Sequence, residues 1–371
     1  MLYKLSDVFD LQMGKTPSRD NNMYWKDGNL PWVSIADLSK SQIYIENSKE
    51  MITKLAAKDT LMKCIPQDTV IMSFKLSLGK TAITRTPLYT NEAIMAFLDK
   101  KVIQIESKYI YFLFRNIQWG QHTNNAVKGK TLNKKFFSDF QINIPEYIQQ
   151  TKIASILIRI NKILEYKHSL IKAYDALIKS RFVELFGDPN IVKSNKCVKF
   201  SSIAKIITGN TPSRKSPEYY GDYIEWIKSD NIVSTDLYIS QAKEFLSEQG
   251  AVKGRIAPKD SLLMTCIAGS IRSIGNVGLC NRSVAFNQQI NAIVLENDIN
   301  PLYVYWLLKL FKPSIIANVE MSLKGIISKS QLENMFIPIV ASNTEQELFA
   351  KFVLQINKLK SDVQKSIDET Q

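Results

Sequence analysis

The 371-residue chain has few of the residues from which proteins build metal sites and disulfides. It contains two histidines, His122 and His168, and four isolated cysteines without C-x-x-C spacing. Zinc and iron sites consist mostly of such residues, so no metal site is expected. Isolated cysteines without a secreted context predict reduced thiols in a cytosolic chain.

Long apolar runs and catalytic motifs are scarce as well. No apolar run reaches the ~18 residues that a membrane span needs, and Met1 to Asp7 lacks the apolar core of a signal peptide. There is no G-x-x-x-x-G-K-[ST] loop for ATP, no glycine-rich turn for a nucleotide cofactor, and no triad context for either histidine. The sequence therefore predicts no catalytic residue and no membrane partner.

Acidic residues are outnumbered. Forty-eight Lys and Arg against 35 Asp and Glu give a formal net charge of +13 at pH 7. A basic globular protein favours anionic partners, of which nucleic acid is the commonest. The alternative interpretation is a generally basic, solvated surface without a specific partner.

A long stretch without proline or glycine, Ile148 to Leu185, stands out from the rest of the chain. Its apolar residues recur every three or four positions, which predicts one helix of ~57 Å at 1.5 Å per residue. Pro145 before it and Gly187-Asp188-Pro189 after it are helix-stop signals. Heptad spacing predicts a seam that needs a second helix. The predicted seam residues are Ile153, Ile160 and Tyr174 at one position and Ile156, Ile163, Leu170 and Leu177 at the other.

The two halves of the chain resemble each other, with an offset that stays within a few residues of 194. Gly14 to Arg19 reads G-K-T-P-S-R, and Gly209 to Arg214 reads G-N-T-P-S-R. Other matched segments follow in the same order. They are Tyr24-Trp25 with Tyr219-Tyr220, Pro31–Ser34 with Glu225–Lys228, Pro66–Met72 with Pro258–Met264, Ser77–Ile83 with Ser273–Leu279, Thr90–Ile94 with Phe286–Ile290, and Tyr109–Leu113 with Tyr303–Leu307. The chain is therefore one duplicated unit.

Each unit is expected to be mixed α/β (α+β), because short β-branched and aromatic runs alternate with turn residues and a helix. The second unit also ends in a helix, Thr344 to Ile367, so the order is globule, helix, globule, helix. If the two helices pair antiparallel as a coiled coil, the globules lie at opposite ends of a rod, related by a pseudo-two-fold axis. Such an object suits two DNA half-sites ~34–36 Å apart or a multiple of that. The predicted strands are Trp32–Ile35, Thr69–Ser73, Val102–Ile105, Gln141–Ile144, Leu262–Cys266, Ala292–Leu295 and Phe336–Val340, and the predicted shorter helices are Tyr109–Ile117 and Leu302–Phe311.

Candidate DNA contacts fall into three groups. The repeated turns combine hydroxyls, free backbone N–H groups and cations, which suits phosphate oxygens; they contribute Lys15, Thr16, Ser18, Arg19, Asn210, Thr211, Ser213, Arg214 and Lys215. Polar residues after each tryptophan are candidates for base edges, namely Ser34, Asp37, Lys228 and Asn231. Basic loop residues complete the set, namely Lys75, Lys80, Arg85, Lys128, Lys130, Arg272 and Lys324.

Each of these residues also has a simpler interpretation. The repeated G-x-T-P-S segments could equally be ordinary turns that expose charge, and the single basic residues could be scattered surface charge. Trp32 and Trp226 are expected in the core. Asn91 and Asn287 recur at equivalent places and are expected to make structural hydrogen bonds, while Gln288 and Gln289 carry the groups that pair with adenine.

The duplicated G-x-T-P-S…Y-W/Y…W unit, with a helix after each copy and Phe186-Gly187-Asp188-Pro189 after the first helix, resembles the specificity subunit of Type I restriction–modification enzymes over essentially the whole chain. Pro145 to Ile153 is similar to the family's P-x-x-x-E-Q-x-x-I helix start, with Gln149 in place of Glu. The second copy keeps Glu345-Gln346 but has Val340 in place of the proline.

The resemblance implies two target recognition domains, at 1–145 and 187–341 (with 187–199 as a linker), and two spacer helices, at 146–186 and 342–371. Each recognition domain would read one half of a bipartite double-stranded DNA target. The helices would set the unread spacer and dock two modification (methyltransferase) subunits, which bring S-adenosylmethionine. Restriction subunits with ATP and magnesium would join them. This chain would do no chemistry itself and would work in the bacterial or archaeal cytoplasm, at the nucleoid.

The far end of the long helix is the predicted dock for a modification subunit, through Tyr174, Leu177, Ile178 and Phe182. Two alternatives from other classes stay open. One is a self-contained DNA methyltransferase or nuclease with degenerate motifs, which would turn over DNA without a partner. The other is a basic helical adaptor for RNA or protein, which would select no DNA motif.

Overall fold

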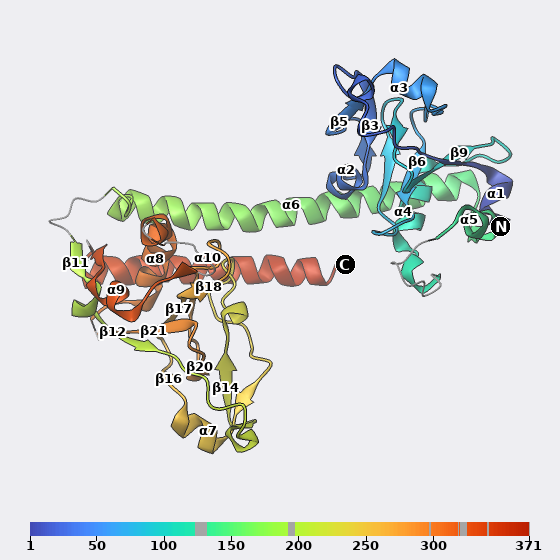
Figure 1. Cartoon of the computed structure of the whole chain (residues 1–371). Coiled ribbons are helices and arrows are strands. Elements are labelled where there is room, and N and C mark those ends of the chain that lie inside the picture. The colour runs from blue at the N-terminus through green and yellow to red at the C-terminus, as the bar shows by residue number, and fades with distance from the viewer. Residues whose placement is uncertain are drawn as a thin grey trace. The chain divides into compact units, whose positions relative to one another are not determined.

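The computed structural model describes residues 1–122, 132–191, 197–296, 298–317, 319, 325–339 and 341–370. The chain forms two compact units, Met1–Leu164 and Glu165–Gln371. The longest helix, α6 (Tyr147–Phe186), begins in the first unit and ends in the second (Figure 1). Its 40 residues correspond to about 60 Å, which confirms the predicted long helix to within one residue at each end. The boundary between the two compact units falls within this helix, between Leu164 and Glu165.

The first unit is built on a mainly antiparallel five-stranded sheet, ordered β2-β9-β6-β7-β4. It also contains a three-stranded sheet, ordered β5-β3-β8. Parallel pairing occurs between β4 and β7 and between β3 and β8. The strands are β1 (Leu2–Lys4), β2 (Phe9–Met13), β3 (Leu30–Val33), β4 (Tyr44–Ile45), β5 (Glu50–Ile52), β6 (Val70–Ser73), β7 (Thr81–Thr84), β8 (Tyr89–Thr90), β9 (Ile94–Asp99) and β10 (Gln141–Asn143). The helices are α1 (Leu5–Val8), α2 (Ile35–Lys40), α3 (Lys54–Asp59), α4 (Ser107–Asn116) and α5 (Lys134–Asp139), with short 3-10 turns η1 (Asn22–Tyr24) and η2 (Trp119–His122).

The second unit has a four-stranded sheet β12-β21-β17-β19 and a five-stranded sheet β13-β15-β14-β20-β16. The strands are β11 (Cys197–Lys199), β12 (Ala204–Thr208), β13 (Tyr220–Gly221), β14 (Ile224–Ile227), β15 (Phe245–Leu246), β16 (Ile256–Ala257), β17 (Leu262–Thr265), β18 (Ile267–Ala268), β19 (Val277–Leu279), β20 (Val284–Phe286), β21 (Ile290–Leu295), β22 (Gly325–Ile326) and β23 (Phe336–Pro338). The helices are α7 (Glu248–Lys253), α8 (Pro301–Ile316), α9 (Lys329–Asn334) and α10 (Asn343–Asp368), with 3-10 turns η4 (Phe200–Ser202), η5 (Pro217–Tyr219) and η6 (Ser229–Asn231).

The two units repeat the same strand order. The run β2-β9-β6-β7 in the first unit corresponds to β12-β21-β17-β19 in the second. The parallel pair β3–β8 corresponds to the parallel pair β14–β20. The repeat read from the sequence, and the mixed α/β (α+β) fold expected for each copy, are therefore confirmed.

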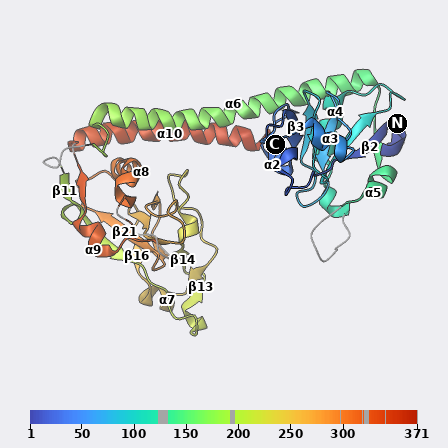
Figure 2. The ribbon, with the colours of Figure 1, turned by 45° about the horizontal axis from the view of Figure 1, so that its top comes forward.

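Within the second unit, α10 packs antiparallel to the C-terminal half of α6 (Figure 2). Lys167 Nζ donates to Ser366 Oγ at 2.8 Å near one end of the pair. Further along, Lys360 Nζ lies 2.6 Å from Asp175 Oδ1. The ring of Phe182 then lies 5.4 Å from that of Phe349. Positions therefore rise along α6 as they fall along α10, and the predicted antiparallel pairing is confirmed.

One of the two predicted seam positions is displaced by one residue, whereas Tyr174, at the other position, packs against the core that includes residues of α10. Leu170 and Leu177 remain 41% and 46% exposed, whereas the following residues, Ile171 and Ile178, are half-buried and buried. Apolar residues occupy adjacent heptad positions on α6, so periodicity alone could not tell which stripe faces the partner. Ile178 and Phe182 lie in the core of the second unit. Their assignment to a partner dock is therefore wrong, because no other subunit reaches them without opening that core.

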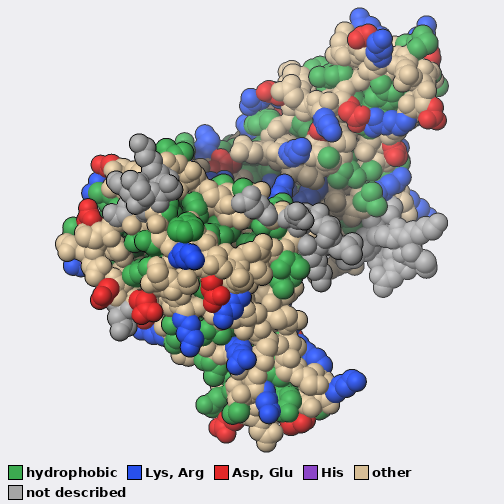
Figure 3. Space-filling model, turned by 60° about the vertical axis from the view of Figure 1, so that its left-hand side comes forward, with side chains coloured by type: hydrophobic (Ala, Val, Ile, Leu, Met, Phe, Trp, Pro, Cys, Tyr) green, Lys and Arg blue, Asp and Glu red, His purple; other side chains and the backbone are tan. Residues whose placement is uncertain are grey.

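Two features of the surface bear on function. None of the helices in the described ranges is both long and apolar enough to cross a membrane. Figure 3 shows Lys and Arg side chains interspersed with Asp and Glu over the face that it presents. The excess positive charge is thus spread over this face and is not gathered in one field.

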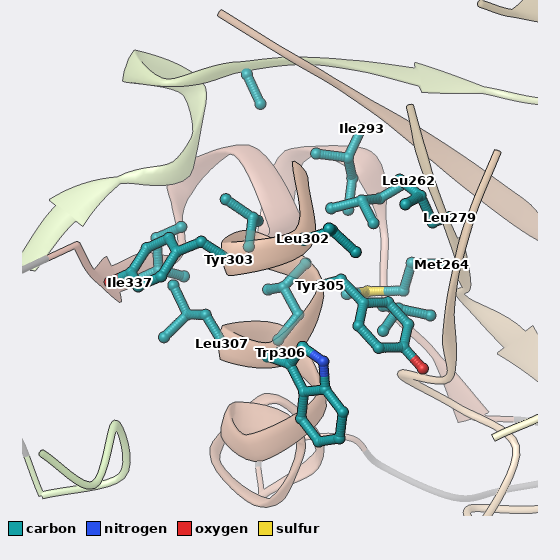
Figure 4. Packing of buried hydrophobic residues seen from close by; sticks show 14 of the residues in the cluster. Leu262, Met264, Leu279, Ile293, Leu302, Tyr303, Tyr305, Trp306, Leu307 and Ile337 are labelled. Atoms are coloured by element: carbon teal, nitrogen blue, oxygen red, sulfur yellow. The ribbon is translucent and has the colours of Figure 1, made fainter. Parts of the chain in front are cut away.

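The core of the second unit centres on α8, in which every residue from Leu302 to Leu308 is buried. Leu302, Tyr303 and Trp306 of α8 are 8%, 0% and 4% exposed. Figure 4 shows Leu302 facing the strand residues Leu262 and Ile293, and Tyr303 on the other side of the helix beside Ile337. A buried side chain of this size contributes about 1.5–3 kcal/mol. The helix therefore holds the sheet that carries the loops described below.

A buried glutamine secures the start of each long helix. Gln150 is 1% exposed; its Oε1 accepts from Glu106 N at 2.9 Å and its Nε2 donates to Gln104 O at 3.0 Å and Pro145 O at 2.9 Å. Gln346 is 2% exposed; its Oε1 accepts from Asn300 N at 2.9 Å, and its Nε2 donates to Ala341 O at 3.1 Å. The glutamine of the helix-start motif thus ties each long helix to the segment before α4 or α8.

One predicted strand, Val102 to Ile105, is wrong. The strand at this place is β9, and the chain leaves the sheet after it. Lys101 has φ +61°, a left-handed conformation, and its N–H donates to Asp99 Oδ1 at 2.7 Å. Ile103 and Ile105 still pack against the core, but from a loop. Their apolar spacing reflects burial without strand pairing.

Candidate nucleic-acid interface

In the first unit, backbone hydrogen bonds bring four separate segments together at the ends of β3, β6 and β9. Gly14 N donates to Ile94 O at 3.2 Å, Asn91 N to Val33 O at 3.1 Å, and Phe74 N to Ala93 O at 2.9 Å. We call the result the loop face of the first unit. It consists of Lys15–Arg19, Ser34–Asp37, Lys75 and Asn91–Ala93.

The second unit repeats these contacts. Gly209 N donates to Ile290 O at 3.0 Å, Asn287 N to Ile227 O at 3.0 Å, and Cys266 N to Gln289 O at 2.8 Å. Its loop face consists of Asn210–Lys215, Lys228–Asn231, Ile267 and Asn287–Gln289. The structure therefore brings together the residues that the sequence singled out in the G-x-T-P-S loops and after each tryptophan.

Glycine is required where each loop crosses the turn below it. A Cβ on Gly14 would lie 2.2 Å from Asn91 O, and one on Gly209 would lie 2.2 Å from Asn287 O. No real Cβ comes so close to a carbonyl oxygen. Glycine at the first position of the G-x-T-P-S motif thus allows the loop to lie directly against this turn.

Several predicted phosphate contacts are engaged within the loop face. Lys15 Nζ donates to Thr60 O at 2.8 Å, and Asn210 Nδ2 donates to Lys253 O at 2.7 Å. Both side chains therefore hold the C-terminal end of a short helix, α3 or α7. Thr16 and Thr211 hydrogen-bond to the turn below through Glu92 and Gln288. Ser18, Ser213 and Lys215 are exposed at the tips of the loops.

The arginine of each loop is clamped. The guanidinium carbon of Arg19 lies 3.9 Å from the ring centroid of Trp25 and 5.0 Å from that of Trp32. Arg19 Nη2 also donates to Glu50 Oε2 at 3.0 Å. This hydrogen bond holds the pKa of the Glu50 carboxyl below its usual value and raises the pKa of Arg19. We call Arg19, Trp25, Trp32 and Glu50 the arginine clamp of the first unit.

The second unit has an equivalent arginine clamp. The guanidinium carbon of Arg214 lies 4.5 Å from the ring centroid of Tyr220 and 5.0 Å from that of Trp226. Its Nη2 lies 2.6 Å from Glu244 Oε2, and Lys228 also pairs with Glu244. The hydrogen bond from Lys228, followed by that from Arg214, lowers the pKa of the Glu244 carboxyl. Sequence reasoning missed Glu50 and Glu244, although their separation of 194 matches the repeat.

Asp37 and Asn231, proposed from the sequence as base readers, close local turns. Asp37 Oδ2 accepts from Ser34 N at 2.9 Å and Ser34 Oγ at 2.7 Å, which caps α2. Asn231 is 8% exposed; its Oδ1 accepts from Lys228 N at 3.0 Å and its Nδ2 donates to Gln241 O at 3.0 Å. These bonds favour a structural role for Asp37 and Asn231, and base contact by any of the four predicted residues stays a prediction.

Asn91 and Asn287 make the structural hydrogen bonds that the sequence predicts for them. Asn91 Oδ1 accepts from Ala93 N at 3.1 Å, and Asn287 Oδ1 accepts from Gln289 N at 3.1 Å. Each therefore shapes the turn under its G-x-T-P-S loop. In the second unit Gln289 Oε1 also accepts from Ser229 Oγ at 3.2 Å, so that Gln289 is oriented on the loop face.

The remaining basic candidates lie around the loop between β6 and β7 and its counterpart. Lys75 Nζ lies 5.4 Å from the ring centroid of Phe74, and the guanidinium carbon of Arg85 lies 4.6 Å from that of Tyr44. Lys80 and Arg272 are exposed. Lys128, Lys130 and Lys324 lie outside the described residues. In the described ranges, no group of three or more His, Cys, Asp or Glu is placed to hold a metal ion.

A protein-family model identifies the family to which this duplicated chain is related. The model for the Type I restriction modification DNA specificity domain matches residues 1–173 and 193–370. The chain belongs to this family. The two matched segments correspond to the two repeats, each followed by its long helix.

Individual members of this specificity family are distant relatives. The MjaIX specificity subunit of Methanocaldococcus jannaschii is 25% identical over 256 residues, which cover 68% of this chain and 58% of the relative. The HindI specificity subunit of Haemophilus influenzae is 26% identical over 160 residues, covering 41% of this chain and 34% of the relative. The matches thus span less than two thirds of these relatives.

Solved structures show the shared fold. The S subunit of a Type I restriction–modification system from M. genitalium has a TM-score of 0.56 and 14% identity, covering 100% of this chain and 92% of that one. A chain from a structural study of complex assembly and conformational transition in a type I system has a TM-score of 0.65 and 14% identity, covering 100% and 94%.

Proposed function

We propose that the chain is the DNA sequence-recognition subunit of a Type I restriction–modification complex, and that each unit reads one half of a bipartite double-stranded target through its loop face. The observation that supports this most is the duplicated loop face, in which a common backbone carries different side chains. Ser34 corresponds to Lys228, and Glu92 to Gln288. Because hydrogen-bonding side chains read base edges, such differences give two readers with different preferences.

Phosphate contacts would come from the exposed cations and hydroxyls beside each loop face. Ser18, Ser213 and Lys215 occupy the loop tips, and Lys80 and Arg272 the neighbouring loops. Contacts of this kind bind all sequences and make binding depend on salt. Replacing Lys80 and Lys215 by glutamine should therefore weaken binding to all duplexes and reduce the salt slope by about 0.9 for each phosphate that is no longer neutralised. An unchanged salt slope would remove these two residues from the interface.

Partner subunits would dock on a stripe that the fold leaves exposed. Ile156, Ile163, Leu170 and Leu177 follow one another at seven-residue spacing on α6 and are 48%, 47%, 41% and 46% exposed. Heptad-spaced apolar residues are the contact pattern of a packed helix. The modification subunits are the partners proposed for this stripe, with S-adenosylmethionine bound to them and with ATP and magnesium bound to restriction subunits. The chain itself has no catalytic role in this proposal.

The docking stripe can be separated from the seam by two neighbouring substitutions. Leu177→Lys should abolish co-purification with the modification subunits and leave the fold intact, because Leu177 is half exposed. Ile178→Lys should unfold the second unit, because Ile178 is fully buried. Normal complex formation by Leu177→Lys would contradict docking at this stripe.

The helices would also set the distance between the half-sites. A seven-residue insertion in α6 adds about 10 Å and roughly two turns, which keeps the apolar stripes nearly in register. The selected spacer should then lengthen by about 3 base pairs at ~3.4 Å per pair, while both half-sites stay the same. An unchanged spacer would show that α6 does not set this distance.

The decisive experiment is a selection from a random duplex library with the full chain and its co-expressed modification subunits. The proposal predicts enrichment of one bipartite motif. Exchanging Ser34 for Lys should alter the first half-site only, and exchanging Lys228 for Ser the second only. Absence of any enriched motif, or DNA turnover by the purified chain alone, would overturn the proposal.

A further inference from the structure

We propose that Arg19 and Arg214 are positioning residues that hold the G-x-T-P-S loops in their DNA-reading form, and that they are not phosphate contacts. The inference rests on the proposed DNA-reading function and revises two residues that the sequence assigned to phosphate. It follows from the two arginine clamps, each of which combines an arginine, two aromatic residues and a glutamate.

The aromatic residues of the clamp hold the loop backbone directly. In the first unit Trp25 Nε1 donates to Ser18 O at 2.9 Å, and Trp32 Nε1 donates to Lys15 O at 2.9 Å. Their rings meet edge to face, with centroids 5.1 Å apart. The loop thus lies on a rigid aromatic platform through two of its own carbonyl groups.

Arg19 packs on the two rings of this platform. Its guanidinium covers both rings and forms a two-pronged pair with the Glu50 carboxylate, which follows β3 in the chain and belongs to β5. A planar guanidinium is suited to stacking and to forked carboxylate pairing at the same time, and a lysine ammonium is not. The residue after the loop serine is therefore fixed at three points.

The second unit reaches the same arrangement with a different aromatic residue. Tyr220 replaces Trp25, and its hydroxyl donates to Pro212 O at 2.7 Å. Trp226 Nε1 donates to Asn210 O at 3.4 Å. Arg214 again covers both rings and pairs with a glutamate. The clamp is kept although one of its members has changed, which points to the loop conformation as the feature it serves.

The glutamate partner allows an experiment to distinguish the two roles of Arg19, because the two roles predict opposite effects of removing the glutamate on DNA binding. The side chains of Arg19 and Glu50 are 50% and 39% exposed, so a phosphate could also reach the arginine. If Arg19 contacts phosphate, removing the negative charge of Glu50 strengthens DNA binding. If Arg19 positions the loop, removing Glu50 weakens binding, because the loop loses its anchor.

The experiment uses the full chain with its modification subunits and a random 40-base-pair duplex library, followed by affinity measurements on the selected target. Glu50→Gln is expected to weaken binding to the target about threefold to tenfold and to blur the first half-site, with the second half-site unchanged. Arg19→Lys is expected to weaken binding to the same extent although it keeps the charge. The salt slope should stay at the wild-type value in both variants.

Asp20→Asn is the matched control, since it removes one negative charge from the same loop without touching the clamp. It should bind the target at least as tightly as the wild type. The unchanged second half-site shows in the same selection that the variant chains are folded.

Three results would overturn the inference. They are tighter binding by Glu50→Gln, wild-type binding by Arg19→Lys, and a salt slope reduced by about one in Arg19→Gln. A wild-type chain that enriches no motif would instead overturn the proposed function, so the two failures are distinguishable.

Discussion

The two units of the chain keep the same scaffold under their loop faces and change what lies on top of it. Gly14 and Gly209 and the asparagine turns recur with equivalent hydrogen bonds, and the arginine clamps recur with one aromatic residue and its hydrogen bond changed. These contacts involve backbone atoms, the side chains that hydrogen-bond to them, and the arginine–glutamate pairs. They are what a loop needs in order to keep one shape, whichever residues it exposes.

The differences lie at exposed positions and in one loop length. Six positions separate Ser73 from Gly79 in the first unit, and ten separate Thr265 from Gly275 in the second. Both loops end on a glycine with positive φ, +79° and +72°. The loop of the second unit is therefore longer between the same fixed ends. A duplicated reader that varies in this way can recognise two different half-sites without a change of fold.

The largest expected effect comes from the two equivalent glycines. Gly14→Ala and Gly209→Ala should each destabilise their own unit by about 3 kcal/mol, because the added Cβ meets a carbonyl oxygen. Each variant should lose the half-site of its own unit and keep the other. Hydrogen exchange, resolved by unit, measures the first effect, and duplex selection measures the second.

Gly187→Ala is the control for these variants. Gly187 has φ +81°, but a Cβ there meets nothing within 4 Å. The cost should be the conformational one alone, about 1 kcal/mol. If Gly14→Ala and Gly187→Ala cost the same, the close approach of the loop to the turn is not what the motif glycine serves.

The buried glutamines should differ in the size of their effect. Gln150→Leu leaves one N–H and two carbonyl groups unsatisfied, whereas Gln346→Leu leaves one of each. At about 1 kcal/mol per group, the losses are about 3 and about 2 kcal/mol in the free energy of unfolding of the respective units. Hydrogen exchange at Glu106 N and Asn300 N reports each site directly.

Gln149→Leu is the matched control, because the neighbouring glutamine is exposed. It should change stability by less than about 0.5 kcal/mol. Equal losses from Gln150→Leu and Gln346→Leu would show that the additional hydrogen bond of Gln150, to Gln104 O, contributes nothing.

Much of this fold could be predicted from the sequence, because its signals are local or repeated. The long helix has stop signals at both ends, and the repeat predicts that the two units share one fold. One of the two seam positions of α6 could not be predicted, since Leu170 and Ile171 are both apolar and only the position of α10 chooses between them. The strand predicted at Val102 to Ile105 is wrong because apolar spacing indicates burial, and residues of a loop can be buried as well.

The candidate site divides in the same way. The G-x-T-P-S loops and the asparagine turns were found because they recur in the sequence. Glu50 and Glu244 were missed, because an ion pair across the chain leaves no local pattern. Residue type alone suggests Asp37 and Asn231 as base readers, but it does not reveal that they also close local turns, because capping uses the same carboxylate and amide groups. The roles of these residues depend on which backbone groups lie within reach, and only the folded chain determines that.

The smallest expected effect concerns the acid stability of the two clamps. The folded-state pKa values of Glu50 and Glu244 are lowered, so each pair stabilises its unit above the unfolded pKa of about 4.5. This contribution is lost as the pH falls from there through the folded pKa values. Glu50→Gln and Glu244→Gln should therefore flatten the loss of stability below pH 4.5, each by less than about 1 kcal/mol because both pairs are partly exposed.

Glu244 pairs with two cations and Glu50 with one, so the effect of Glu244→Gln should be the larger. Urea unfolding followed between pH 7 and pH 3 measures both. Asp222→Asn, which removes an exposed carboxylate that forms no ion pair in the described part of the chain, is the control. If Glu50→Gln and Glu244→Gln changed the profile equally, Lys228 would add nothing to the second clamp. Its ammonium would then be free to contact DNA, which is the role that the sequence suggested for it.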